Sequence, residues 1–308
     1  MGVLSVLVFA CGESSDTGTS SSSSSSSSGG VDASQPDGST TTDGSTADGA
    51  TSDGKRTLAS CTTSIAADVP AFYRTYFKCV TITKTADAVV IATESLPPHL
   101  SYYYGSGDPN FEAFDTSRGA QYKPNPNMLS KKAIKITIPD APVPKDGLIV
   151  SAALVDGVVM SSTEEYSLGP VGVALDSVAL FNPLARPGDD IENEKYTFDS
   201  YDAHPAPDGT YHYHRSSKGP IEVLTVAGIS GVEAYGIMCD GTVVLGCTEL
   251  DGSAPAGELD AQGGHVGDVK DKAGTTHFAG RYHTHVCASS PGGRKYTPEV
   301  QYYKTCGR

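Results

Sequence analysis

The sequence predicts a mainly β protein with sandwich-like antiparallel sheets and few short helices, preceded by a disordered tether. Short β-branched runs separated by turn residues recur from Cys79 onward, which is typical of strands. The 34 glycines and 19 prolines among 308 residues indicate many turns. Helical patterns are poor, because the best window, Ser64–Phe77, is interrupted by Pro70 and predicts a short helix at most.

The expected strands begin with a hairpin formed by Val80–Lys84 and Val89–Thr93. The alternating run Ile134–Ile138 predicts a strand with one buried face. An Asp-Gly turn between Ile149–Val155 and Val158–Ser161 predicts a second hairpin. Further strands are expected at Val171–Leu175, Val178–Phe181, Tyr211–His214, Ile221–Val226, Thr242–Leu245 and Tyr282–Val286.

Residues 1–11 are interpreted as a truncated signal peptide with a lipobox. The apolar run Gly2–Ala10 stands directly before Cys11, which resembles the site where bacterial lipoproteins are cleaved and lipidated. Phe9 is larger than the motif prefers and no lysine or arginine precedes it, so we expect the true start to lie upstream. The prediction is an extracytoplasmic protein, either a cell-envelope lipoprotein anchored to the membrane through Cys11 or a secreted protein. An ordinary cleaved signal peptide and a cytosolic protein are the alternatives.

Residues 12–56 are predicted to form a disordered linker. They contain the serine run Ser20–Ser28 and repeated Asp-Gly pairs, and such a segment cannot bury enough apolar surface to offset its chain entropy. Residues 57–168 are then an N-terminal β region, and residues 169–308 are a second region. The boundary is expected near Gly169, and both two sub-domains and one continuous sandwich remain open.

The net charge of -14 excludes a nucleic-acid-binding protein, because no cluster of lysine or arginine is present to neutralise phosphates. Cations remain plausible partners. Besides Cys11 the chain has an even number of cysteines, which is typical of an oxidising compartment. Local clustering favours three disulfides, Cys61 with Cys79, Cys239 with Cys247, and Cys287 with Cys306.

The histidines are unevenly distributed, since only His99 precedes residue 204. The pattern Gly-x-Tyr-His-x-His occurs twice and ends at His214 and at His285. Residues two apart on a strand share one face, so His212 and His214 form one pair and His283 and His285 another. Two such pairs facing each other would supply four imidazoles to one metal ion.

The predicted metal is therefore copper or zinc, held by His212, His214, His283 and His285. His204 and His265 are candidates for additional ligands or for partners of the ligands. Asp199 and Asp240 are the carboxylates expected to orient a ring N–H. The alternative is that each His-x-His pair is an ordinary polar stretch of strand.

At these residues the sequence resembles the YHYH domain family of bacterial secreted proteins, named for the tetrapeptide at 211–214. The resemblance includes Gly169–Asn182, Phe198-Asp199, the histidines and a terminal Cys306, so that it covers about Gly169 to Arg308. It departs from the family pattern at Ala203 and Thr284. It implies a domain assignment and no particular activity.

Three functions stay open. The first is a metal-binding lipoprotein, and the second is a metal-dependent hydrolase or oxidoreductase at the same site, which requires an unfilled ligand position. The third is a non-catalytic envelope or adhesion module in which the histidines pack as polar residues. A large distance between His212 and His283 would favour the third.

Overall fold

The structure, a computed structural model, describes residues 54–145, 169–186, 189–289, 294–299 and 302–304. Cys11, Cys306, nearly all of the linker and the hairpin expected at 149–161 lie outside these ranges. Residues Thr51–Arg308 form one compact unit. Its fold is mainly β, as predicted, with two sheets.

The first sheet contains β1 (Ser64–Ile65), β2 (Thr81–Lys84), β3 (Ala88–Thr93) and β4 (Ile134–Pro139), in this order. β2, β3 and β4 are antiparallel, whereas β1 is parallel to β2. A short helix, α1 (Ala71–Tyr76), has Pro70 as its N-cap, where a proline removes no helical hydrogen bond. The window Ser64–Phe77 thus contains one short helix, in agreement with the prediction of a short helix at most.

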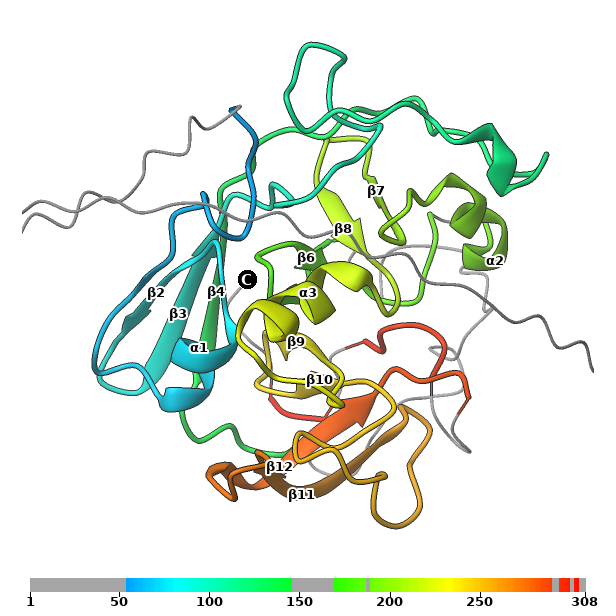
Figure 1. Cartoon of the computed structure of the whole chain (residues 1–308). Coiled ribbons are helices and arrows are strands. Elements are labelled where there is room, and N and C mark those ends of the chain that lie inside the picture. Colours follow the sequence, from blue (N-terminus) through cyan, green and yellow to red (C-terminus); the bar gives the residue numbers. More distant parts are fainter. Residues whose placement is uncertain (1–53, 146–168, 187–188, 290–293, 300–301, 305–308) are drawn as a thin grey trace, which may run out of the picture. The chain divides into compact units, whose positions relative to one another are not determined.

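The second sheet has eight strands in the order β11-β12-β10-β9-β5-β6-β8-β7 (Figure 1). Their bounds are β5 Gly172–Ala174, β6 Ala179–Leu180, β7 Ala203–Pro205, β8 Tyr211–Tyr213, β9 Ala234–Met238, β10 Val243–Leu245, β11 Gly264–Lys270 and β12 Thr276–His285. The other elements are the helices α2 Ile191–Glu194 and α3 Lys218–Val226 and the 3-10 turns η1 Thr116–Arg118 and η3 Lys195–Thr197.

The second sheet consists of two halves with the same arrangement. From its centre outwards the order is β5-β6-β8-β7 on one side and β9-β10-β12-β11 on the other. In each half the first pair is antiparallel, the second parallel and the outermost antiparallel. The central strands β5 and β9 are antiparallel, and Val173 pairs with Ile237, its equivalent in the other half. The halves are thus related by an approximate two-fold axis.

Equivalent backbone contacts extend this relationship to single residues. Gly172 and Gly236 lie on the paired central strands β5 and β9. A Cβ added at Gly172 would be 2.6 Å from the Ile237 carbonyl oxygen, and one added at Gly236 would be 2.3 Å from the Val173 carbonyl oxygen. Both positions therefore require glycine. The turn after β5 places Ser177 at φ 81°, and the turn after β9 places Gly241 at φ 97°.

Two details of the predicted fold are wrong. The sheets are mixed, because β1–β2, β6–β8 and β10–β12 are parallel pairs. The strand expected at Ile221–Val226 is the second half of α3. Its β-branched residues suggested a strand, but the Ser217 side chain caps the helix by accepting from the Gly219 N–H, and Val223 and Leu224 bury one face. Among the described residues no helix is long and apolar enough to cross a membrane.

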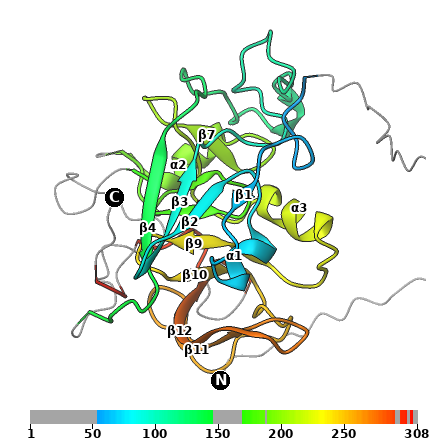
Figure 2. The same cartoon turned by 90° about the vertical axis from the view of Figure 1, so that its left-hand side faces the viewer.

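One hydrophobic core contains residues of both sheets, so the described parts of the expected regions 57–168 and 169–308 pack together. In both cartoon views the ribbons of β2, β3 and β4 lie beside those of β9 and β10 (Figure 2). Hydrogen bonds also connect them. The Thr93 hydroxyl donates to the Ser177 carbonyl at 2.6 Å, and the Ser95 hydroxyl donates to the Tyr211 carbonyl at 2.8 Å. The N-terminal region thereby supports the strand that carries the first histidine pair.

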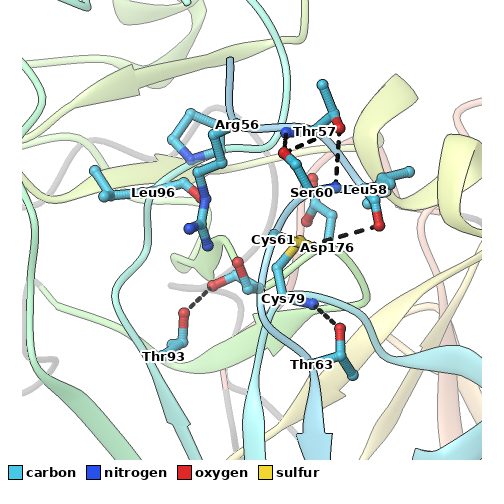
Figure 3. Close-up of a disulfide and its surroundings, with 12 residues drawn as sticks. Arg56, Thr57, Leu58, Ser60, Cys61, Thr63, Cys79, Thr93, Leu96 and Asp176 are labelled. Atoms are coloured by element: carbon cyan, nitrogen blue, oxygen red, sulfur yellow. Dashed lines mark hydrogen bonds between the residues drawn. A yellow bond between two sulfur atoms is a disulfide. The ribbon is translucent and has the colours of Figure 1, made fainter. Parts of the chain in front are cut away.

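The disulfides agree with the prediction in part. Cys61 bonds to Cys79, as expected, beside β2 (Figure 3). Cys247 bonds to Cys287, so the pairings of Cys239 with Cys247 and of Cys287 with Cys306 are wrong. The reason is the parallel pairing of β10 with β12, in which Leu245 is opposite His285 and the cysteines follow two residues later on each strand. Cys239 is also disulfide-bonded.

Candidate metal centres

The alternation along β8 and the residue after it separates the two residue types of the sequence Tyr-His-Tyr-His at 211–214. The Tyr211 hydroxyl donates to Asp199 at 2.5 Å, and the Tyr213 hydroxyl donates to Asp176 at 2.7 Å. The histidines point to the other face, as expected from the period of a strand. There they meet a third histidine, His204, which is directly opposite His212 on β7.

His204, His212 and His214 form a three-histidine centre. The Nε2 atom of His212 lies 3.1 Å from that of His204 and 2.9 Å from that of His214. One ligand atom from each residue lies within 4.8 Å of the others. Nitrogen atoms bound to one ion at about 2.0–2.1 Å are separated by about 2.9 Å in octahedral and about 3.4 Å in tetrahedral geometry. The spacing of the centre is thus that of ligands around one ion.

The outer nitrogen of each ring fixes its tautomer. His212 Nδ1 lies 2.9 Å from the Thr210 carbonyl oxygen, and His214 Nδ1 lies 2.7 Å from the Asn182 carbonyl oxygen. A carbonyl only accepts, so both Nδ1 atoms carry hydrogen and both Nε2 atoms present a lone pair.

His204 Nδ1 lies 2.7 Å from the Thr197 hydroxyl, whose own hydrogen goes to the Glu194 carbonyl at 2.7 Å. The Thr197 hydroxyl oxygen therefore accepts from His204 Nδ1, and the Asn125 amide nitrogen, 3.4 Å from the same Nδ1, donates to the Pro205 carbonyl at 2.9 Å. Three Nε2 lone pairs consequently point toward one another, an arrangement that repels unless a cation lies between them.

Protons are poor candidates for that cation, because the centre is buried. Burial lowers the pKa of His214 to about 4 and the pKa values of His204 and His212 well below the usual range. The Phe181 ring stacks on His212 at 3.7 Å, and the Phe198 ring is parallel to that of His214 at 5.7 Å. The Phe181 and Phe198 rings help to bury the imidazoles, which keeps them neutral, and restrict the orientation of the His212 and His214 rings.

Glu194 lies at the edge of this centre. Its Oε1 is 3.7 Å from His204 Nε2, and its Oε2 is buried without a hydrogen-bond partner among the described residues. Burial, with a smaller contribution from Asp189, raises the pKa of the carboxyl to about 7. Glu194 ends α2, so this carboxylate comes from the connection between β6 and β7.

A second centre occupies the equivalent place in the other half. His265 on β11 is opposite His283 on β12, as His204 is opposite His212. His283 Nδ1 lies 2.9 Å from the Arg281 carbonyl oxygen, and His285 Nδ1 lies 2.9 Å from that of Gly246. Arg281 and Gly246 correspond to Thr210 and Asn182, so the same backbone positions orient the rings in both halves.

The second centre differs by containing a carboxylate. Glu249 Oε1 is 2.9 Å from His265 Nε2 and 3.5 Å from His285 Nε2, and Glu249 Oε2 is 3.0 Å from His283 Nε2. Burial raises the pKa of Glu249, but the hydrogen bonds with His283 and His285 together lower this pKa by more than burial raises it. The pKa of Glu249 therefore lies below its usual range. We call this group, Glu249, His265, His283 and His285, the three-histidine-glutamate centre.

The prediction that the two His-x-His pairs face each other is wrong. Four strands lie between β8 and β12. The two strands are therefore separated by five inter-strand spacings of about 4.8 Å, or roughly 24 Å along the sheet. A large distance between His212 and His283 favours polar packing of the histidines only if both pairs would have to bind one shared ion. Each pair instead recruits a third histidine, so both pairs keep the geometry of ligands.

The expected role of Asp199 and Asp240 is also wrong. Asp199 accepts from the hydroxyls of Ser101 and Tyr211, and Asp240 accepts from the backbone N–H groups of Thr242 and Tyr303. Backbone carbonyls and Thr197 orient the rings instead. Glu249 belongs to the segment that resembles the YHYH family, but neither Glu249 nor Glu194 was among the candidate ligands, because neither stands in a local pattern with a histidine.

Residues 152–261 match the family described as YHYH protein. The match covers less than half of the chain and ends before His265 and the second motif, whereas the resemblance was expected to continue to Arg308. No curated protein and no solved structure matches the chain. The described part of the matched segment, from Gly169 onward, contains the whole three-histidine centre together with Glu194 and Glu249. The C-terminal half of the chain therefore contains a YHYH domain.

Proposed function

We propose that this protein binds two transition-metal ions, Cu(II) or Zn(II), one in each half of its second sheet. The observation that carries the proposal is the convergence of three Nε2 lone pairs from His204, His212 and His214, with every Nδ1 committed to an oxygen acceptor. Imidazole suits zinc and copper, and no cysteine is among the groups of converging ligands.

The equivalent arrangement in the other half supports a second site. Two ring nitrogens there are again committed to carbonyls, and the donor set consists of three imidazoles and one carboxylate, both ligand types that zinc binds in four-coordinate sites. We propose that the ions bind separately, because each half supplies its own ligands. A non-catalytic envelope module without metal is the competing function.

Metal counting on the exported, full-length protein tests the proposal. After dialysis against Zn²⁺ or Cu²⁺ and removal of free ion, we expect two ions per chain. His212→Gln and His283→Gln should each leave one, whereas His277→Gln should leave two, because His277 binds Asp271 outside both centres. A folded wild-type chain without bound metal, or counts that neither ligand variant changes, would overturn the proposal.

We further propose an extracytoplasmic location with a lipid on Cys11. The disulfides Cys61–Cys79 and Cys247–Cys287 support an oxidising compartment, since structural disulfides persist there. Labelling cells with a radioactive fatty acid tests the anchor. Wild-type protein should be labelled and Cys11→Ser should not, and an unlabelled wild-type protein would contradict lipidation.

A further inference from the structure

The two centres share their histidines and differ at the fourth ligand position. In the three-histidine-glutamate centre, Glu249 lies 2.9 to 3.5 Å from all three Nε2 atoms, as a ligand of the same ion would. Glu249 comes from the connection between β10 and β11. The equivalent connection in the other half, between β6 and β7, carries Glu194.

Glu194 does not take the position that Glu249 takes. Its nearer oxygen is 3.7 Å from His204 Nε2, and it is not among the residues whose ligand atoms converge. Thr197 fixes the backbone of Glu194 relative to His204, because the Thr197 hydroxyl donates to the Glu194 backbone carbonyl and accepts from His204 Nδ1. The backbone of Glu194 is thus tied to the outer side of the ring whose inner nitrogen would bind the ion.

From these contacts we propose that the three-histidine centre keeps one coordination position for an exchangeable ligand, water or a small anion, beside Glu194. The three-histidine-glutamate centre is closed by Glu249. This inference rests on the proposed function, since it assigns different roles to the two proposed ions. Three protein ligands with one open position are typical of catalytic zinc sites, and four of structural ones.

The surroundings of Glu194 fit a ligand of this size. Its Oε2 is buried and has no protein partner among the described residues, so a water molecule on the ion could donate to this carboxylate. Phe181 and Phe198 lie against the rings of His212 and His214, which restricts the position to a small molecule. The Glu194 side chain is 23% exposed, so solvent reaches the edge of the centre at this residue.

Azide titration of the cobalt-loaded, full-length protein tests the difference, because visible absorption of Co²⁺ reports its coordination. Cobalt is counted before azide is added, and a wild-type chain that holds no Co²⁺, Zn²⁺ or Cu²⁺ overturns the proposed function itself. With two ions bound, we expect azide to change the spectrum of one. His212→Gln should abolish the response and His283→Gln should retain it.

Glu194→Gln keeps the test decisive if a histidine variant fails to fold. It should retain two Co²⁺ ions and bind azide about three- to tenfold more tightly, because a negative charge beside the anion is removed. Loss of one Co²⁺ would show that Glu194 is itself a ligand and would overturn the open position. A wild-type spectrum unchanged by azide, or a change at both ions, would also overturn the proposal.

Discussion

The Tyr213 hydroxyl donates a hydrogen bond to Asp176 at 2.7 Å, on the face of β8 opposite His212 and His214. The same Tyr213 hydroxyl oxygen lies 3.0 Å from His99 Nε2. The tyrosines of the motif thus fix the strand to a buried polar network, and the histidines on its other face are held in place. In β12, Tyr282 binds Asp260 and Thr284 binds the Gln262 carbonyl, so this second motif is anchored without its second tyrosine.

Gly219 lies against this network, and Gly219→Ala should destabilise the protein. An added Cβ would be 2.2 Å from Asp176 Oδ2 and 2.4 Å from the Tyr213 hydroxyl, and both groups are buried and bonded to each other. We expect a loss of about 1–3 kcal/mol in the free energy of unfolding, measured by denaturant titration. Gly105→Ala is the control, since its Cβ would meet nothing within 4 Å. Equal stability of the two variants would contradict this packing.

Asp176 should make stability fall as pH rises from about 4 to 7. Burial raises the pKa of this carboxyl from 3.8 to about 7, although the bond from Tyr213 lowers it in part. Between these values the folded protein keeps a proton that the unfolded chain releases, so its free energy of unfolding decreases by up to about 1.4 kcal/mol per pH unit. Asp176→Asn should remove this slope in unfolding measured across the range. An unchanged slope would show that Asp176 is ionised in the folded state.

Removal of the Cys247–Cys287 disulfide should weaken metal binding at the three-histidine-glutamate centre. The bond joins the ends of β10 and β12, directly after the Gly246 carbonyl that orients His285. Replacing both cysteines by alanine should lower affinity at this centre about tenfold, as loss of a group that orients a ligand does, and cost about 2–4 kcal/mol of stability. The matched control replaces Cys61 and Cys79, beside the first sheet, and should leave both affinities unchanged. Equal effects of the two double variants on affinity would contradict the local role.

Bound metal should stabilise the fold. A site that exists only in the folded state contributes about 2.7 kcal/mol when free metal is at 100 times its dissociation constant. Thermal unfolding of the zinc-loaded protein should shift to lower temperature on addition of a chelator. The double variant His212→Gln, His283→Gln should show no such shift, and a shift of equal size would indicate that metal binds elsewhere.

The histidines of the two candidate centres were largely predictable from the sequence, whereas their grouping was not. His212 with His214 and His283 with His285 follow from the period of a strand, and His204 and His265 were expected near them. Their division into two centres depends on the parallel pairs β6–β8 and β10–β12, which place the motifs at opposite ends of one sheet. Such long-range pairing is not encoded in the spacing along the chain.

Local sequence patterns also gave wrong predictions where tertiary contacts determine the structure. The β-branched residues of α3 predicted a strand, but the cap at Ser217 and the burial of Val223 and Leu224 favour a helix. Glu249 and Glu194 form no local pattern with a histidine, because only the folding of their loops brings them to the histidines. The repeat itself would have been found by aligning Gly172–Asn182 with Gly236–Gly246, which share the glycine of the central strand and the aspartate of the turn that follows it.

In the proposed function, each half of the second sheet binds its own ion. Anomalous diffraction at the zinc absorption edge, on crystals of the zinc-loaded protein, locates the bound ions. Two peaks are expected, one among the Nε2 atoms of His204, His212 and His214, and one among Glu249, His265, His283 and His285. A single peak shared by both motifs, or no peak at either group in zinc-loaded crystals, would exclude two separate metal sites.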